Sequence, residues 1–537
     1  MGATTSVIIL AGGSLKSKFD YIKVSSECPA LLPVNCKSIT SYIISFYANR
    51  PQCKVYLATN KKYEAEIRQE LNTFDFNIEF IFMPETDDVI SSLQYSVKQL
   101  DPLTEMVIVN LVTTIPTVFP GKNDIQISDR AEISKLWSGY LPGRGFIFKK
   151  NNPGNIPFYA FTGIFCLEKS RLVTFLSREN IDRSDLFSLL NEEDLATFNI
   201  RMGDWLDCGH EVNYYETKTK LISSRTFNNI TFVQRGIIRK SSDNADKLKD
   251  EAAYYGMLPA DVSILFPRLL KEYYKSEEKG VYELEFYGYP NVAELILFWD
   301  LSYDVLRRMF SHFNEILAHL KSHPGSISRE DYVDFYKSKL NSRVREYLSS
   351  LDQEHAAILN DELIVNGVKC LPFYKLTDLI DKKFECLYNE KDICIMHGDF
   401  CYNNILYDVP TGITKLIDPR GSFSEKSKGI FGDHKYDLAK LAHSAIGGYD
   451  FFVNNKYNMA YNGRSFDYSF GNSKHLITTS LMEELIHKSG YELNDIKFIM
   501  GTLFLSMCPL HSDSPKRQMT FYVHGLKILT EVMVPGK

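Results

Sequence analysis

Apolar runs alternate with amphipathic stretches over the first part of the chain. Helical spacing of apolar residues marks 39–47 and 90–100, between runs that are rich in β-branched residues. Such runs are typical of strands that are covered on both faces. They occupy residues 6–11, 54–58, 78–83 and 106–111. Strands that alternate with helices indicate an α/β domain with a parallel, doubly wound sheet, which we place at residues 1–224.

The pattern changes after residue 225. A strand pair over 232–241, a charged helix over 244–256 and another strand over 281–286 come before Pro290. After Pro290 long amphipathic stretches dominate, so the chain becomes mostly helical. We therefore expect a second domain at 225–537, of α+β class, with a small lobe at 225–290 and a helical lobe at 291–537.

Length and composition support a multidomain globular protein. The chain has 537 residues, 44% hydrophobic and 24% charged, and a single core seldom exceeds ~300 residues. The net charge of −6 gives no reason to expect a nucleic-acid partner. We expect no membrane span, because no apolar run reaches 18 residues, and no secretory signal. Ten cysteines without a CxxC pair favour a reducing cytoplasm. The sequence does not indicate an oligomeric state.

The most informative segment begins at His397 and reads H-x-D-x4-N directly after an apolar strand. Asp418 follows Asn404 by fourteen residues and ends another apolar run. Phosphoryl transfer needs a carboxylate that orients the attacking hydroxyl and takes its proton, which suits Asp399. Mg²⁺ that bridges the phosphates of ATP needs hard oxygen ligands, which suits Asn404 and Asp418. This order matches the catalytic loop of kinases, so the pattern predicts an ATP- and Mg²⁺-dependent kinase.

A kinase of this plan also needs a strand lysine that is held by a helix glutamate. Arg239 and Lys240 end a predicted strand and face opposite sides of it, so either could reach the cleft. We prefer Lys240, because lysine normally fills this role, with Glu251 of the next helix as its partner. An ordinary surface pair is the alternative. The strand that ends before the helical part is expected to act as a hinge that receives adenine at Glu285, Phe286 and Tyr287.

Two further charged residues follow the predicted metal ligand. Arg420 lies two residues after Asp418 and is a candidate for contact with an anionic substrate. An ion pair with Asp433 or Asp437 is an equal alternative for it. Asp437 itself is expected to hold the catalytic loop rather than to take part in catalysis.

Residues 225–537 resemble the aminoglycoside phosphotransferase/choline kinase superfamily. The matching pieces are His397-Gly-Asp399 with Asn404, Ile417-Asp418-Pro-Arg420, and Gly432-Asp followed by Tyr-Asp437-Leu-Ala. The resemblance implies a two-lobed, protein-kinase-like fold that uses MgATP to phosphorylate a hydroxyl of a small molecule. Substrates in that superfamily include aminoglycosides, choline, ethanolamine, sugars and homoserine.

Residues 1–224 resemble the sugar-1-phosphate nucleotidyltransferases, which implies a Rossmann-like fold. A strand runs into a small-residue loop at Gly12 and Gly13, where backbone amides can approach phosphates. Ala30-Leu-Leu-Pro-Val34 is similar to the segment after that family's first helix. The segment Trp205-Leu-Asp207-Cys-Gly209 is similar to the one in which that family's aspartate helps to hold Mg²⁺.

The same domain departs from the family at three places. Ser14-Leu-Lys-Ser-Lys18 replaces the usual Gly-Thr-Arg, so that Lys16 or Lys18 would have to stand in for the arginine. Cys28-Pro29 replaces a Pro-Lys pair, and Val112-Thr113 replaces the Gly-Asp that supplies the other metal ligand. Such losses remove charge stabilisation from the site. We therefore expect a weak or inactive transferase, in which Asp207 is a relic or a turn carboxylate.

These observations favour a small-molecule kinase, with a sugar or an amino alcohol as acceptor, fused to a degenerate nucleotidyltransferase domain. Surface-glycan or lipid precursor synthesis would use such a pairing, because the kinase makes a phosphate that a transferase can activate. One alternative is a fully bifunctional kinase/nucleotidyltransferase that makes an NDP- or CDP-activated compound. The other is a nucleotide-binding scaffold without catalysis.

Overall fold

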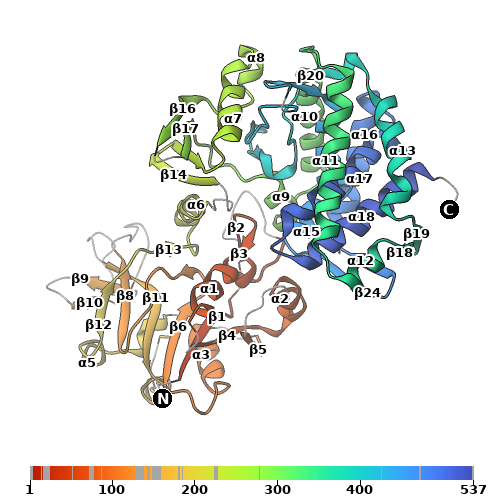
Figure 1. The fold of residues 1–537 in the computed structure, drawn as a ribbon. Coiled ribbons are helices and arrows are strands. Elements are labelled where there is room, and N and C mark those ends of the chain that lie inside the picture. The colour runs from red at the N-terminus through yellow and green to blue at the C-terminus, as the bar shows by residue number, and fades with distance from the viewer. Residues whose placement is uncertain are drawn as a thin grey trace. The chain divides into compact units, whose positions relative to one another are not determined.

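The computed structural model separates into two compact units, Met1–Ile222 and Ser223–Lys537, two residues before the expected boundary (Figure 1). It describes residues 4–13, 15, 25–50, 53–71, 78–85, 88–128, 138–141, 145–147, 159–179, 182–183, 185–222, 228–276, 279–424, 426–470 and 473–534. The predicted class, an α/β unit followed by a two-lobed α+β unit, is confirmed.

The N-terminal unit is built on a nine-stranded sheet whose main path is β10-β9-β11-β6-β1-β4-β5. The four predicted strands are present and parallel: β1 (Thr5–Ala11), β4 (Cys53–Asn60), β5 (Ile78–Met83) and β6 (Met106–Leu111). The helices of this unit are α1 (Ile39–Ala48), α2 (Glu64–Leu71), α3 (Val89–Val97), α4 (Lys169–Leu176), α5 (Glu192–Leu195) and α6 (Glu211–Lys220).

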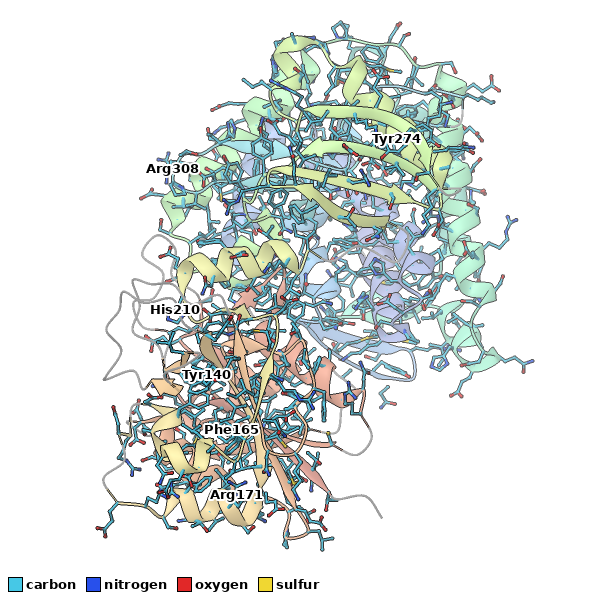
Figure 2. The ribbon with its side chains drawn as sticks, turned by 90° about the vertical axis from the view of Figure 1, so that its left-hand side faces the viewer. Tyr140, Phe165, Arg171, His210, Tyr274 and Arg308 are labelled. Carbon is cyan, nitrogen blue, oxygen red and sulfur yellow. The ribbon has the colours of Figure 1, made fainter. Side chains whose placement is uncertain are left out.

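The expectation of a purely parallel sheet is wrong for the other half of this sheet. Strand β11 (Tyr159–Glu168) runs antiparallel to β6 and also pairs with β8 and β9. Its interior is buried throughout, with Phe165 in the core of the unit (Figure 2). A strand covered on both faces reads as one apolar run whatever its direction, so the pattern gives no direction. The remaining strands are β2 (Pro33–Val34), β3 (Lys37–Ser38), β7 (Thr114–Ile115), β8 (Asp124–Ser128), β9 (Gly139–Leu141), β10 (Gly145–Ile147), β12 (Asn199–Met202) and β13 (Leu206–Asp207).

The small lobe of the C-terminal unit is an antiparallel sheet of order β14-β15-β17-β16, against which α7 packs. Its elements are β14 (Asn228–Gln234), β15 (Ile237–Ser242), α7 (Ala245–Met257), α8 (Ala260–Ser263), β16 (Leu269–Ser276) and β17 (Lys279–Glu285). Strand β16 was not predicted. It is an edge strand with few buried residues, so its sequence lacks the apolar alternation that marks a strand.

The large lobe is mainly helical, as predicted. Its helices are α9 (Val292–Phe298), α10 (Tyr303–Lys321), α11 (Arg329–Ser349), α12 (Gln353–Leu359), α13 (Phe373–Leu387), α14 (His434–Ala445), α15 (Tyr449–Val453), α16 (Ser473–Lys488), α17 (Leu493–Met507) and α18 (Pro515–Met533). Two antiparallel strand pairs carry the predicted site: β20 (Ile393–Ile395) with β23 (Phe431–Asp433), and β21 (Ile405–Tyr407) with β22 (Thr414–Leu416). A small sheet was not foreseen: β18 (Leu363–Val365), β19 (Val368–Cys370), β24 (Asn458–Asn462) and β25 (Ser465–Ser469).

One described segment, Leu493–His511, is long and apolar enough to cross a membrane by length and composition alone. It contains α17, which packs against α11, α14 and α18 inside the large lobe, and 61% of its most apolar window is buried. The core helix of a globular lobe has the same composition, so this helix is weak evidence for a membrane span.

Candidate active site

The predicted catalytic residues converge at the ends of the short strands of the large lobe. The side-chain amide of Asn404 donates to Asp399 Oδ2 at 2.8 Å and to the Asp399 carbonyl at 3.0 Å. The amide of Ile417 donates to the Asn404 carbonyl at 3.0 Å. Pairing of β21 with β22 therefore brings the end of one predicted strand, and with it Asp418, beside the catalytic loop.

A buried carboxylate fixes the start of this loop. Asp437 accepts from the amide of His397 at 2.7 Å and from the amide of Gly398 at 2.8 Å. Burial raises the pKa of Asp437 to about 7, although both amides favour its charged form. The prediction that Asp437 holds the loop is confirmed by this geometry. Gly398 has φ +80°, and a Cβ there would lie 2.5 Å from the Arg420 Cβ, so only glycine fits between the histidine and Asp399.

His397 is a neutral spacer in the same loop. Its Nε2 donates to the Ile417 carbonyl at 3.0 Å, and its Nδ1 accepts from the Asp399 amide at 3.2 Å. Complete burial lowers the pKa of His397 to about 4. A neutral ring with one donor and one acceptor satisfies both contacts, and it ties the two halves of the site together.

The small lobe supplies the expected ion pair. Lys240 Nζ lies 2.5 Å from Glu251 Oε1 of α7 and 2.8 Å from Asp418 Oδ1. Burial opposes the charge of Lys240, but the two carboxylates outweigh it and hold its pKa above the usual value. Arg239 faces the other side of β15, where it pairs with Glu283 at 2.8 Å. Of the two cations, Lys240 is the one that pairs with Glu251, and it is buried rather than part of a surface pair.

A second lysine, which the sequence analysis missed, contacts the predicted base. Lys440 Nζ of α14 lies 2.9 Å from Asp399 Oδ1. Burial opposes its charge, but Asp399 raises its pKa above the usual value. Lys440 follows Asp437 by three residues on the same helix, and that spacing is the signal that could have identified it. Asp399 remains 32% exposed, so an acceptor can still reach it.

The donor set fits a hard divalent cation. The Asn404 amide nitrogen is committed to Asp399, so its carbonyl oxygen is the atom available to a cation. The Asp418 side chain is 38% exposed, and its backbone has φ +57°, a left-handed conformation that aspartate and asparagine adopt more easily than most residues. Amide and carboxylate oxygens are the ligands that Mg²⁺ prefers, so Asn404 and Asp418 could hold it.

The three predicted hinge residues point in different directions. Phe286 packs edge-on against Phe232 with ring centres 4.9 Å apart, and its amide donates to the Gly236 carbonyl at 2.8 Å. The carboxylate of Glu285 instead accepts from the Tyr287 hydroxyl at 3.0 Å. The side chain of Glu285 thus makes a contact within the predicted hinge segment itself.

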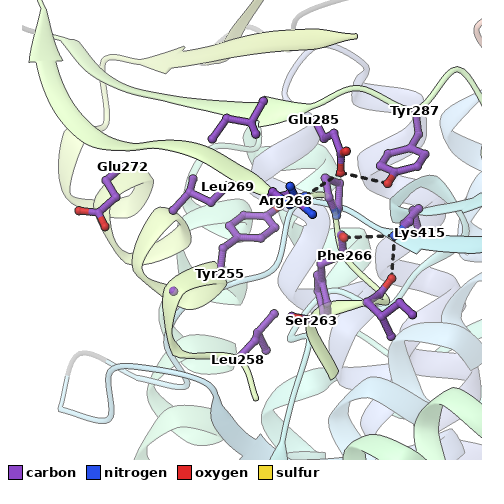
Figure 3. A pocket seen from close by; sticks show the side chains of 14 residues that line it. Tyr255, Leu258, Ser263, Phe266, Arg268, Leu269, Glu272, Glu285, Tyr287 and Lys415 are labelled. Carbon is purple, nitrogen blue, oxygen red and sulfur yellow. Dashed lines mark hydrogen bonds between the residues drawn. The ribbon is translucent and has the colours of Figure 1, made fainter. Parts of the chain in front are cut away.

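Glu285 and Tyr287 line a pocket of about 670 Å³, together with residues of α7, α8 and β16 (Figure 3). Lys415 closes one side of it and donates to the Ile264 carbonyl at 2.7 Å. None of Lys240, Asp399, Asn404 and Asp418 lines this pocket, but its lining residue Phe266 stacks on the ring of His397, with ring centres 5.9 Å apart.

Arg420 does not form an ion pair with Asp433 or Asp437, which was the alternative to a role in substrate contact. Within the described ranges no carboxylate pairs with Arg420. Asp433 accepts instead from the hydroxyls of Tyr332 and Tyr336, both at 2.9 Å, and Asp437 is occupied by the two loop amides. The Arg420 guanidinium thus lies beside the catalytic loop and contacts the Tyr436 hydroxyl instead of a carboxylate.

The candidate site of the N-terminal unit is filled by its own contacts. Asp207 is buried and accepts from the Gly209 amide at 2.8 Å and the Asn213 amide group at 2.9 Å, while His210 Nδ1 lies 2.8 Å from its Oδ2. The Cys208 amide donates to the Thr113 carbonyl at 2.7 Å, which places Thr113 beside Asp207. The position where the resemblance implies a second carboxylate therefore holds a hydroxyl.

The glycine loop of this unit follows β1. A Cβ on Gly12 would lie 2.5 Å from Ser92 Oγ, so close packing on α3 already requires a glycine there. At Gly13 a Cβ would meet no atom within 4 Å. Lys16 and Lys18, the candidate replacements for arginine, lie outside the described residues.

No protein-family model matches the chain, and no curated protein matches it. Solved structures are similar to each half. The N-terminal part is similar to 4-diphosphocytidyl-2C-methyl-D-erythritol synthase from Anaerococcus prevotii, with 14% identity, 41% of this chain and 99% of that chain covered, and a TM-score of 0.29.

The rest of the chain is similar to aminoglycoside phosphotransferases. A thermostable mutant of APH(4)-Ia has 12% identity, with 59% of this chain and 94% of that chain covered and a TM-score of 0.39. APH(3'')-Id from Streptomyces rimosus, solved with ADP and streptomycin, has 14% identity. The similarity covers 56% of this chain and 92% of that chain, with a TM-score of 0.32. Similarities this remote assign neither an activity nor a substrate to this chain.

Proposed function

We propose that the C-terminal unit is an ATP- and Mg²⁺-dependent kinase that phosphorylates a hydroxyl of a small molecule, a sugar or an amino alcohol. The observation that carries the proposal is the meeting of Asp399, Asn404 and Asp418 with the buried pair of Lys240 and Glu251. Each of these groups has a defined task in phosphoryl transfer, and together they leave two half-exposed carboxylates at one place.

In this proposal Asp399 orients the acceptor hydroxyl and takes its proton. The contact with Lys440 fixes the direction of the Asp399 carboxylate. Lys240, positioned by Glu251, binds phosphate oxygens of the nucleotide. Held by Asn404 and Asp418, Mg²⁺ would neutralise charge on those phosphates.

The N-terminal unit is proposed to be a nucleotidyltransferase-like unit of weak or no activity. Its one carboxylate at the expected place, Asp207, is held by three donors, and its neighbour is Thr113. The kinase product would be a phosphate ester of the type that such transferases activate, which fits the synthesis of surface-glycan or lipid precursors. We place the reaction in the cytoplasm, where ATP is available and where the ten free thiols would stay reduced.

The test is ATP turnover by the full chain in a screen of sugars and amino alcohols. We expect Mg²⁺-dependent ADP release with at least one class of hydroxyl compound, and its loss in Asp399→Asn. Formation of a nucleotide-activated product from CTP, UTP or dTTP would instead support the bifunctional alternative. Absence of Mg²⁺-dependent binding of any nucleotide would refute the kinase proposal.

A further inference from the structure

A cluster of cationic side chains lies beside the predicted base, around the hydroxyl of Tyr436. Lys339 Nζ of α11 is 2.9 Å from that hydroxyl, and an Arg420 guanidinium nitrogen is 3.4 Å from it. Lys440, one turn further along the helix of Tyr436, contacts Asp399. We call Lys339, Arg420, Tyr436 and Lys440 the Tyr436 cluster.

The Tyr436 cluster carries more positive charge than its surroundings neutralise. In the part of the chain that the structure describes, no carboxylate pairs with Lys339 or Arg420. Both cations lie instead over the ring of Phe335, at 5.1 Å and 4.8 Å from its centre. Arg343, one turn after Lys339, adds a fourth cation nearby and donates to the Ser506 carbonyl. Like charges brought together at low exposure are unfavourable unless an anion joins them.

The electrostatics of the two central groups agree with an unfilled anion site. Burial lowers the pKa of Lys339 to about 8; Tyr436 opposes this shift, and the charges of Arg420 and Lys440 add to it. Burial would raise the pKa of Tyr436, but Lys339, Lys440 and Arg420 outweigh it and bring the value to about 8. The cations thus favour the ionised form of the Tyr436 hydroxyl, and the same charges would favour a bound oxyanion.

The Tyr436 cluster lies beside the catalytic loop that carries Asp399. Arg420 flanks the catalytic loop, since a Cβ on Gly398 would touch it at 2.5 Å. Tyr436 and Phe335 are buried, whereas Lys339 and Arg420 are half-buried. The two partly exposed cations thus lie on buried aromatic rings, next to a carboxylate, Asp399, that is itself partly exposed.

We propose that the Tyr436 cluster binds an anionic group on the acceptor, so that the substrate is a hydroxyl compound that already carries a phosphate ester or a carboxylate. This inference rests on the proposed kinase function, which defines the acceptor side. In the reaction the acceptor oxygen forms a bond to the γ-phosphorus and the bond from that phosphorus to the β,γ-bridging oxygen breaks. The hydroxyl proton passes to Asp399, ADP leaves, and the existing anionic group is unchanged.

The test is a calorimetric titration of the full chain with inorganic phosphate, and separately with acetate, in the presence of saturating Mg²⁺ and AMP-PNP. We expect phosphate or acetate to bind while the γ-phosphate of AMP-PNP occupies its own site. Lys339→Met and Arg420→Gln should each weaken that affinity about tenfold or more and leave AMP-PNP affinity within about twofold. Lys337→Met is the matched control, because Lys337 lies on the same helix but pairs with Glu385.

The outcomes separate the two proposals. Tighter binding of phosphate identifies a phosphate ester as the acceptor's anion, and tighter binding of acetate identifies a carboxylate. Binding that disappears when AMP-PNP is present would assign the cluster to the nucleotide's γ-phosphate and overturn the inference, although the kinase proposal would stand. An equal loss in Lys337→Met would overturn it as well. Failure of Mg²⁺ and AMP-PNP to bind would refute the kinase proposal itself.

Discussion

Asp399 is the residue on which the proposed chemistry depends most. It is held by the Asn404 amide on one oxygen and by Lys440 on the other, so its direction is fixed before a substrate arrives. Preorganisation of this kind is what a general base needs, and such bases contribute about 10²–10⁴-fold to rates.

Replacing Asp399 by asparagine keeps the shape and removes the proton acceptor. We expect Asp399→Asn to lower turnover by about 10²–10⁴-fold while AMP-PNP affinity stays within about threefold. The measurements are steady-state ADP release and calorimetry. Asp408→Asn, a change at a partly buried residue in the turn between β21 and β22, is the control and should turn over normally. Wild-type turnover in Asp399→Asn would rule out its role as the base.

Asp418 can be tested without disturbing its backbone. Asparagine tolerates the left-handed conformation at φ +57°, so Asp418→Asn removes the charge alone. We expect the Mg²⁺-dependent part of the nucleotide affinity to fall about tenfold or more, because one anionic ligand is lost. A titration of AMP-PNP at several Mg²⁺ concentrations measures it. An unchanged Mg²⁺ dependence would exclude Asp418 as a ligand.

His397 makes the stability of the C-terminal unit sensitive to acid. Its pKa is about 4 in the folded chain and about 6.5 when unfolded. Between pH 6.5 and pH 4, His397 binds a proton in the unfolded chain but not in the folded chain. The stability that neutral His397 contributes is therefore complete above pH 6.5 and is lost as the pH falls towards 4. Protonation of His397 should lower the free energy of unfolding by about 2 kcal/mol between pH 7 and pH 5. Urea unfolding at both pH values should show a smaller loss in His397→Gln; an equal loss would contradict the assignment.

At the scale of elements, the site depends on the docking of α7 against the large lobe. Gly421 has φ +71°, and a Cβ there would lie 2.3 Å from the Asp250 carbonyl oxygen on α7. The residue after Asp250 is Glu251, which positions Lys240. The close approach of the Asp418-Pro-Arg-Gly421 turn to α7 therefore determines where Glu251 can pair with Lys240.

Gly421→Ala should displace α7 and with it the Lys240–Glu251 pair. We expect the KM for ATP to rise about tenfold or more, since misplacement of a positioning group weakens phosphate binding. Gly412→Ala is the matched control, because Gly412 has φ +75° but its Cβ would meet only the Tyr407 hydroxyl at 3.7 Å. Both variants should lose about 1 kcal/mol from backbone strain. Equal KM values in the two would show that docking of α7 does not control the site.

Elements with a clear periodic pattern could be predicted from the sequence, and elements set by their partners could not. Strands β1, β4 and β6 are largely buried apolar runs, β5 is an apolar run that is only partly buried, and all four lie at nearly the predicted bounds. The edge strand β16 and the small sheet of β18, β19, β24 and β25 are partly or largely exposed. Their strand pairing comes from neighbours rather than from an apolar pattern, which is why they were missed.

The candidate site divides in the same way. Asp399, Asn404 and Asp418 lie within one short stretch whose spacing reflects the local hairpin, so the sequence identifies them. Lys339 meets Tyr436 across 97 residues of sequence, and no local pattern links the two. Tertiary packing alone brings such pairs together, so the cationic cluster could be recognised only in the folded chain.

At the scale of the whole molecule, the chain joins a unit that carries the proposed kinase site to a unit proposed to be a transferase of weak or no activity. In the N-terminal unit Asp207 is occupied by donors from its own turn and helix. We expect Asp207→Asn to lower the melting temperature of that unit, because a buried acceptor is changed, without loss of kinase turnover. The assays are thermal unfolding and ADP release. A CTP- or UTP-dependent product that disappears in Asp207→Asn would contradict an inactive transferase.

The most direct test of the whole account is a crystal structure of the full chain with Mn²⁺ and AMP-PNP, in which anomalous scattering locates the metal. We predict a peak within ligand distance of Asn404 and Asp418, about 2.1 Å from their oxygens, with the γ-phosphate facing Asp399. A metal–nucleotide complex bound elsewhere in the chain, with these three side chains untouched, would contradict the assignment of the kinase site.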